Sequence, residues 1–207
     1  MATISNIEAE AKNTASDSKA EVHTESNELA PDVGTYDQKA GFSQWETVTK
    51  YHGPNKLYRS SSPNYDEDKG DASQVIKDAD LKFLKTQGIQ HVICLNSDEL
   101  SSYKIGVQFA NATPKIEFTR IPVEDYHSPT LAQMETAYKA YVTQKKDTLV
   151  WCGFGYGRTG TMITALQYKN EKGKVKFSHN DYLANHVEQM HMGKSTMQFE
   201  TLDKLQK

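Results

Sequence analysis

One passage constrains the fold of this chain more than any other: a short apolar strand runs into a glycine-rich loop, and a helix follows at once. Thr148 to Trp151 is an apolar run typical of a buried strand, and Cys152 follows it. Thr159 to Lys169 then carries apolar side chains at helical spacing. Glycine permits backbone angles that other residues resist, so the turn between the two elements can be tight. The glycines of this turn are Gly153, Gly155 and Gly157.

The rest of the chain alternates between strand and helix signals. Ile89–Leu95 and Ile116–Val123 are apolar runs that predict buried strands. Thr130 predicts the start of a helix, because Gln133 three residues on completes a capping box. The other expected helices are Asp78–Gln87, Asn180–Met192 and Thr196–Leu205. Since strands separated by helices favour parallel pairing with both faces covered, we expect an α/β fold with a central, mostly parallel sheet of four to five strands flanked by helices.

The composition changes near residue 40. Residues 1–40 are rich in small, polar and acidic side chains and contain no aromatic residue before Tyr36. Such a segment cannot bury enough apolar surface to offset the entropy of ordering it, so we expect a disordered tail. Phe42, Trp45 and further apolar residues then arrive together, which predicts one folded domain over residues 41–207.

Charge and cysteine content narrow the classes of protein. The net charge of −3 indicates no general attraction to nucleic acid or to an anionic membrane, and no apolar run reaches the length of a membrane span. The start of the chain lacks the basic and apolar regions of a secretory signal. Two cysteines are too few for a disulfide framework and suggest a reducing compartment. We expect a cytoplasmic monomer without stable membrane association; export by a specialised system that reads the tail stays an alternative.

The spacing of residues in the glycine-rich loop suits a phosphate group. Five residues separate Cys152 from Arg158, and only three of the 24 Lys and Arg residues are arginines. A tight loop before a helix turns successive N–H groups toward one centre, and the helix N-terminus adds partial positive charge there. Arg158 contributes a planar fork that matches two phosphate oxygens. The expected phosphate-binding residues are Gly153, Phe154, Gly155, Tyr156, Gly157 and Arg158.

The same loop can activate a nucleophile. Its positive field favours a thiolate over a thiol at Cys152, and a thiolate can attack phosphorus. The hydroxyl of Thr159 can donate to the sulfur, which helps the thiolate to leave in a second step. No group of His, Cys and Asp has the spacing of metal ligands, so we expect no metal and no other cofactor.

These residues resemble the signature of the cysteine-dependent tyrosine and dual-specificity phosphatases: a Cys, five residues, an Arg, and then Ser or Thr. The segment from Gly41 to Pro63 also looks like the start of the small bacterial-type and atypical dual-specificity domains. The resemblance implies a protein-tyrosine-phosphatase-like fold and catalysis through a phosphocysteine intermediate. The family usually has a His before the Cys, where this chain has Trp151.

The resemblance also implies a general acid, because the family takes an Asp from a mobile loop after the preceding strand. Here residues 120–129 follow a predicted strand and resemble the Pro-x-Glu-Asp loop of the dual-specificity and lipid-phosphatase branches. The matching residue is Asp125. Glu124 and His127 are alternatives, since either could reach the site from the same loop.

Three hypotheses about function follow. The favoured one is hydrolysis of phosphate monoesters on proteins, with phosphotyrosine preferred and dual specificity left open. Trp151 motivates the second, a phosphopeptide-binding domain without catalysis. The third is a phosphoinositide phosphatase; lipid phosphatases of this superfamily often carry Lys in the loop, where this chain has Phe154 and Tyr156, so a phosphorylated protein is the better match. Pocket depth decides among substrates, and we expect loops over 61–77 and 96–115 to set it.

Two further residues have alternative interpretations. Cys94 lies in an apolar run and is expected to be a buried structural cysteine, although pairing with Cys152 as a redox guard is an alternative. Arg59 is expected to form an ion pair within the first segment of the domain, and contact with the substrate is its alternative.

Overall fold

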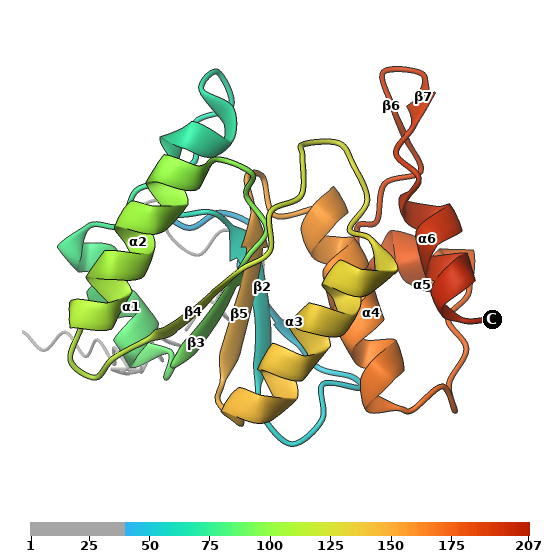
Figure 1. The fold of residues 1–207 in the computed structure, drawn as a ribbon, viewed down its shortest axis with the longest axis horizontal. Helices are drawn as coiled ribbons and strands as arrows, with labels where there is room; N and C mark the ends of the chain where they lie inside the picture. Colours follow the sequence, from blue (N-terminus) through green and yellow to red (C-terminus); the bar gives the residue numbers. More distant parts are fainter. Residues whose placement is uncertain (1–39) are drawn as a thin grey trace, which may run out of the picture. The chain divides into compact units, whose positions relative to one another are not determined.

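The computed structural model describes residues 40–207 (Figure 1). The predicted disordered tail over residues 1–40 lies outside the described residues except for Ala40, which is buried. None of the described helices is long and apolar enough to cross a lipid bilayer.

A five-stranded sheet forms the centre of the domain. Its strands are β1 (Glu46–Val48), β2 (Leu57–Ser61), β3 (His91–Cys94), β4 (Glu117–Arg120) and β5 (Thr148–Cys152). They lie in the order β1-β2-β5-β3-β4. The strands β2, β5, β3 and β4 pair in parallel, and the short edge strand β1 runs antiparallel to β2. The prediction of a mostly parallel sheet is confirmed.

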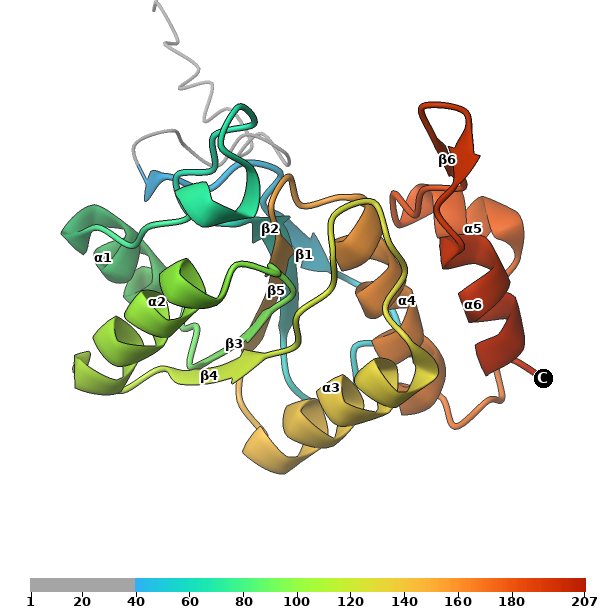
Figure 2. The same ribbon diagram turned by 45° about the horizontal axis from the view of Figure 1, so that its top comes forward.

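Helices cover both faces of this sheet, as Figures 1 and 2 show. The helices are α1 (Asp78–Thr86), α2 (Glu99–Asn111), α3 (Leu131–Gln144), α4 (Gly157–Asn170), α5 (His179–Ala184) and α6 (Gln198–Leu205). The first two lie on one side of the sheet, and the other four lie on the opposite side. The expected arrangement of helices on both faces is therefore present.

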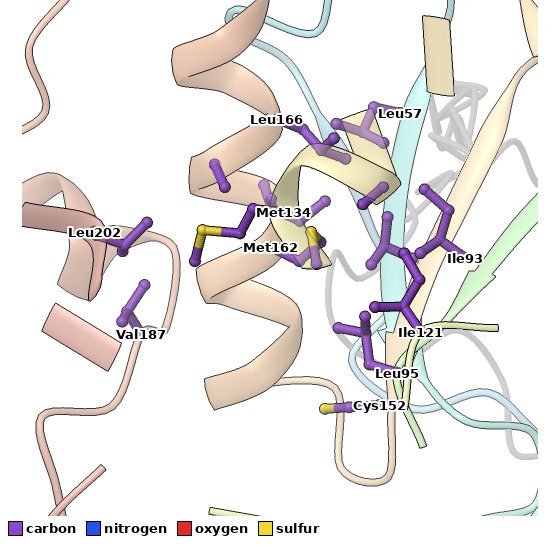
Figure 3. Close-up of a cluster of buried hydrophobic side chains, with 14 of the residues drawn as sticks. Leu57, Ile93, Leu95, Ile121, Met134, Cys152, Met162, Leu166, Val187 and Leu202 are labelled. Carbon is purple, nitrogen blue, oxygen red and sulfur yellow. The ribbon is translucent and has the colours of Figure 1, made fainter. Parts of the chain in front are cut away.

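Each face of the sheet has its own hydrophobic cluster, because side chains alternate along a strand. Val150 and Cys152 point into the cluster on the side of α3 and α4, whereas Leu149 and Trp151 point into the other. Figure 3 shows Cys152 at the edge of the first cluster, where β5 turns into the loop before α4. A fully buried Leu or Ile in such a cluster stabilises the fold by roughly 1.5–3 kcal/mol. Packing in this cluster therefore fixes the position of the end of β5, where Cys152 lies.

The helix expected after Thr130 begins as predicted. The Gln133 N–H donates to Thr130 Oγ1 at 3.2 Å, and the Thr130 N–H donates to Gln133 Oε1 at 2.8 Å. This reciprocal pair satisfies two N–H groups that the first turn leaves without intrahelical partners.

The expectation of a loop over residues 96–115 is wrong, because this range contains α2. Asp98 caps the helix by accepting the Ser101 N–H at 2.8 Å. Ile105 and Phe109 are buried on its inner face. Exposed apolar residues on the outer face make the helical spacing of the apolar residues hard to recognise in the sequence.

The helix expected over Asn180–Met192 is also wrong in length, since α5 ends at Ala184. A hairpin follows, formed by β6 (Met190–His191) and β7 (Lys194–Ser195). Met192 and Gly193 both have positive φ, as the two-residue turns favoured in hairpins require.

Candidate active site

The loops at one end of the sheet form the candidate site. The segments that follow β2, β4 and β5 meet at the carboxyl ends of these parallel strands (Figures 1 and 2), where α/β folds commonly bind ligands. Together with the segment after α5 and the start of α6, they line a pocket of about 530 Å³. Its lining includes Tyr65, Asp125, Cys152, Arg158, Glu188 and His191.

The glycine-rich loop curls around the Cys152 sulfur at this pocket. The Gly155 N–H donates to Cys152 Sγ at 3.3 Å, and α4 begins at Gly157. Gly155 has a φ of +97°, and a Cβ at this position would lie 2.5 Å from the Ser61 backbone nitrogen. The close approach of the loop to β2 therefore requires glycine. The first turn of α4 borders the pocket, since Gly157 and Arg158 both line it.

Three residues provide oxygen atoms that contact the Arg158 guanidinium. It donates to both carboxylate oxygens of Asp71 at 2.7 and 2.9 Å, and to the Val123 carbonyl at 2.9 Å. Arg158 Nη2 also lies 2.8 Å from Asp125 Oδ1. Burial disfavours the charge on Arg158, but Cys152, Asp71 and Asp125 outweigh it and raise the pKa of the guanidinium. The fork is thus a fixed cation at the base of the pocket.

Asp71 is a residue of the candidate site that no sequence pattern indicated. It lies in a short helical turn, Gly70–Ser73, within the range 61–77 that was expected to be a loop. Its Oδ2 also accepts the Ser97 N–H at 2.7 Å and the Ser97 hydroxyl at 3.0 Å. A buried arginine needs a carboxylate partner, but no motif or spacing indicated which acidic residue supplies it.

Of the three candidates for the general acid, Asp125 lines the pocket and contacts Arg158. The Glu124 side chain is 80% exposed and lies 3.9 Å from His127 Nδ1. His127 borders a neighbouring groove instead. The geometry therefore favours Asp125 over its two neighbours.

The remaining predicted residues divide between the rim and the interior. Phe154 and Tyr156 line the pocket with their rings 5.1 Å apart, and the Tyr156 hydroxyl donates to Gln44 Oε1 at 2.7 Å. The Thr159 hydroxyl is buried and has no hydrogen-bond partner within the described part of the chain. Its proposed bond to the sulfur is not formed here, so that role stays a prediction.

Trp151 and Cys94 lie on the face of the sheet opposite Cys152. The Trp151 ring packs 6.1 Å from Phe42 and 6.2 Å from Phe109, measured between centroids. Cys94 belongs to the same cluster and is a free, fully buried thiol whose pKa burial raises. Cys94 thus has the expected structural position, and the sheet separates its sulfur from Cys152.

The lining of the pocket is acidic. Four carboxylate residues line the pocket, against Arg158 and His191 as the groups that can carry positive charge. The four are Glu67, Asp68, Asp125 and Glu188. Burial raises the pKa of Glu188, and Asp125 adds to the rise, while His191 and Arg158 oppose it.

This fold, with a cysteine and an arginine on a glycine-rich loop at the end of a parallel strand, defines a phosphatase domain of the cysteine-dependent type. A family model described as "Swiss Army Knife protein, DSP-PTPase phosphatase domain" matches residues 72–194, more than half of the chain. The chain belongs to this family. No curated protein matches it.

Solved structures share the fold at low sequence identity. Kinase associated phosphatase, solved with its catalytic-site cysteine replaced by serine, has a TM-score of 0.55 and 19% identity over 78% of this chain and 93% of its own. A putative phosphatase (DUF442) from Shewanella putrefaciens CN-32 has the same TM-score and identity over 80% and 90%. The catalytic core of the PP-IP phosphatase SIW14 from S. cerevisiae has a TM-score of 0.52 and 13% identity over 77% and 83%.

Proposed function

We propose that this protein hydrolyses phosphate monoesters on proteins, with phosphotyrosine preferred, through a phosphocysteine intermediate. The observation that carries the proposal is the Cys152 sulfur, which accepts the Gly155 N–H at the base of a pocket that Arg158 also lines. Backbone N–H groups and a guanidinium around one centre stabilise both a phosphate dianion and an ionised sulfur.

The reaction has two steps in this proposal. Cys152 Sγ attacks phosphorus, the bond from phosphorus to the ester oxygen breaks, and Asp125 gives its proton to that oxygen. Water then attacks the phosphocysteine, the bond between sulfur and phosphorus breaks, and Asp125 takes a proton from the water. Inorganic phosphate leaves and the thiolate is regenerated. Arg158 binds the phosphate oxygens in both steps, and the phosphate competes with Asp125 for the same guanidinium nitrogen.

The lining of the pocket supports a phosphorylated protein over a phosphoinositide. Four carboxylates repel a ligand that carries several phosphate groups. The residues that line the pocket in the described part of the chain include no lysine. The aromatic side chains of Tyr65, Phe154 and Tyr126 border the same space and offer flat surfaces to a phosphotyrosine ring.

A panel of substrates tests this proposal. With a chelator present throughout, we expect kcat/KM for a phosphotyrosyl peptide to exceed that for a phosphatidylinositol polyphosphate in micelles by at least about tenfold, because the acidic lining of the pocket repels the polyanion. Peptides with Lys beside the phosphotyrosine should react faster than matched peptides with Glu, and added salt should reduce the difference. Faster turnover of the phosphoinositide would favour the lipid-phosphatase alternative.

The alternative of a binding domain without catalysis rests on Trp151. In the structure this side chain packs into the core on the face away from the pocket, while the loop around Cys152 keeps its N–H contact to the sulfur. Its position therefore favours hydrolysis. Tight binding of phosphotyrosyl peptide together with no release of phosphate would reverse this choice.

The role of Asp125 is tested by the leaving group. We expect Asp125→Asn to lower kcat/KM for a phosphotyrosyl peptide by about 10²-fold, since general acid catalysis typically contributes 10²–10⁴-fold. The loss should be much smaller with 2,4-dinitrophenyl phosphate, whose leaving oxygen needs no proton. Glu124→Gln is the matched control, because that exposed side chain lies outside the pocket. An equal loss for both substrates would contradict a proton donated by Asp125.

A further inference from the structure

A second buried guanidinium lies behind the phosphate-binding loop, and the mechanism above does not use it. Arg59 is in β2, and only 2% of its side chain is exposed. Its Cα is paired with Val150 of β5, two residues before Cys152. Because residues two apart in a strand share a face, Arg59 lies on the same side of the sheet as Cys152 but is absent from the lining of the pocket.

We propose that Arg59 is a positioning residue that holds the phosphate-binding loop in its anion-binding form. The inference rests on the proposed function, since it assigns a role at the same site. The ion pair expected within the first segment of the domain is present, since Arg59 Nε lies 3.9 Å from Glu46 Oε2. The shorter contacts of Arg59, however, are to backbone carbonyl groups of other elements. These contacts are the basis of the proposal.

Arg59 connects the loop to the helices behind it. Its Nη2 donates to the Gly155 carbonyl at 2.7 Å, and its Nη1 donates to the Asn185 carbonyl at 2.7 Å. The Asn185 amide in turn donates to Thr164 and Gln167 of α4, both at 2.8 Å. One planar group therefore fixes the loop relative to β2 and α4 together.

The bond to the Gly155 carbonyl sets the direction of an N–H group. A trans peptide is planar, and its C=O and N–H point in opposite directions. Because Arg59 holds the Gly155 carbonyl on the buried side of the loop, the N–H of Tyr156 points to the other side, where Tyr156 lines the pocket. Loss of Arg59 would free this peptide to rotate and turn a carbonyl oxygen toward the phosphate.

The positive charge of Arg59 also favours an anion in the loop. Glu46, its carboxylate neighbour, is 41% exposed, and Arg59 Nε makes no hydrogen bond within the described residues. Burial lowers the pKa of Arg59, while Glu46, Cys152 and Tyr156 oppose that change. Because nearby carboxylates compensate this cation only weakly, it adds positive potential behind the loop, on the same side of the sheet as Cys152.

Binding of tungstate, a phosphate-like oxyanion, tests this role without requiring turnover. We expect Arg59→Gln to weaken tungstate binding, measured by calorimetry, by at least about tenfold, because a loop carbonyl is no longer held away from the anion. Arg59→Lys keeps the charge but cannot reach both carbonyls, so its affinity should be intermediate. Glu46→Gln, the control, should bind tungstate within about twofold of wild type, as both carbonyl contacts remain.

The same variants separate positioning from mere stability. A purely structural role would lower the unfolding temperature or the fraction of active sites, with tungstate affinity and KM of the remaining sites unchanged. Folded Arg59→Gln that binds tungstate as tightly as wild type overturns the inference; if this variant does not fold, unchanged affinity in Arg59→Lys overturns it instead. Wild type that binds tungstate but hydrolyses nothing would refute the proposed catalysis and leave the test of Arg59 intact.

Discussion

Cys152→Ser is expected to lower kcat for a phosphotyrosyl peptide by at least about 10⁴-fold, the scale at which enzymes lose activity with their nucleophile. A serine hydroxyl is far less acidic than a thiol, so the field of the loop cannot ionise it at neutral pH. The substitution is nearly isosteric, and the Gly155 N–H can donate to the serine oxygen as it does to Sγ. The variant should therefore still bind phosphopeptide, which calorimetry would show beside the loss of phosphate release.

The other cysteine provides the matched control. Cys94 is fully buried on the opposite face of the sheet, with Sγ 3.7 Å from Gln74 Oε1 and 3.8 Å from Ser102 Oγ. Serine suits these polar neighbours, so Cys94→Ser should keep kcat within about threefold of wild type, as substitutions away from a site usually do. Full turnover by Cys152→Ser, or an equal loss in both variants, would remove Cys152 from the mechanism.

Local sequence patterns predicted the elements that depend on neighbouring residues. The strand before Cys152, the tight loop and the helix after it follow from a short apolar run, three glycines and helical periodicity. The capping box at Thr130 was likewise predicted from local spacing, because it involves only two residues three positions apart. Parallel pairing followed from the alternation of strands and helices, because a parallel pair needs a crossover.

The pairings within the candidate site that the sequence did not predict depend on contacts between distant segments. Asp71 and Arg158 are 87 positions apart, so their pairing follows from the assembled fold and not from local spacing. Arg59 and Gly155 are 96 positions apart, and their contact is equally invisible in the sequence. The hairpin after α5 was missed for a local reason. Met192 adopts a left-handed backbone conformation, which is uncommon for methionine and so is not predicted from the residue type.

Arg158→Lys is the second substitution from which we expect a large effect, a fall in kcat/KM of about 10³-fold, as for the loss of a principal oxyanion donor. Lysine keeps the charge but has no planar fork. In the structure the guanidinium contacts both Asp71 oxygens, the Val123 carbonyl and Asp125 at the same time. One ammonium group cannot hold these acceptors and two phosphate oxygens together. Arg120→Lys is the comparison, because Arg120 does not line the pocket and reaches Asp71 only through the Ser97 carbonyl, so its loss should be much smaller.

A double-mutant cycle of Asp71 and Arg158 tests the role of the planar fork in a second way. If Asp71 acts by orienting the Arg158 fork, Asp71→Asn should lower kcat/KM by about tenfold in wild type but change it little in Arg158→Lys, because residues that act as one unit are not additive. The four kinetic constants of this double-mutant cycle, measured with one phosphotyrosyl peptide, decide the matter. Independent losses that multiply would mean that Asp71 contributes to catalysis by a route other than Arg158. Near wild-type activity in Arg158→Lys would mean that charge alone, and not the planar fork, binds the phosphate.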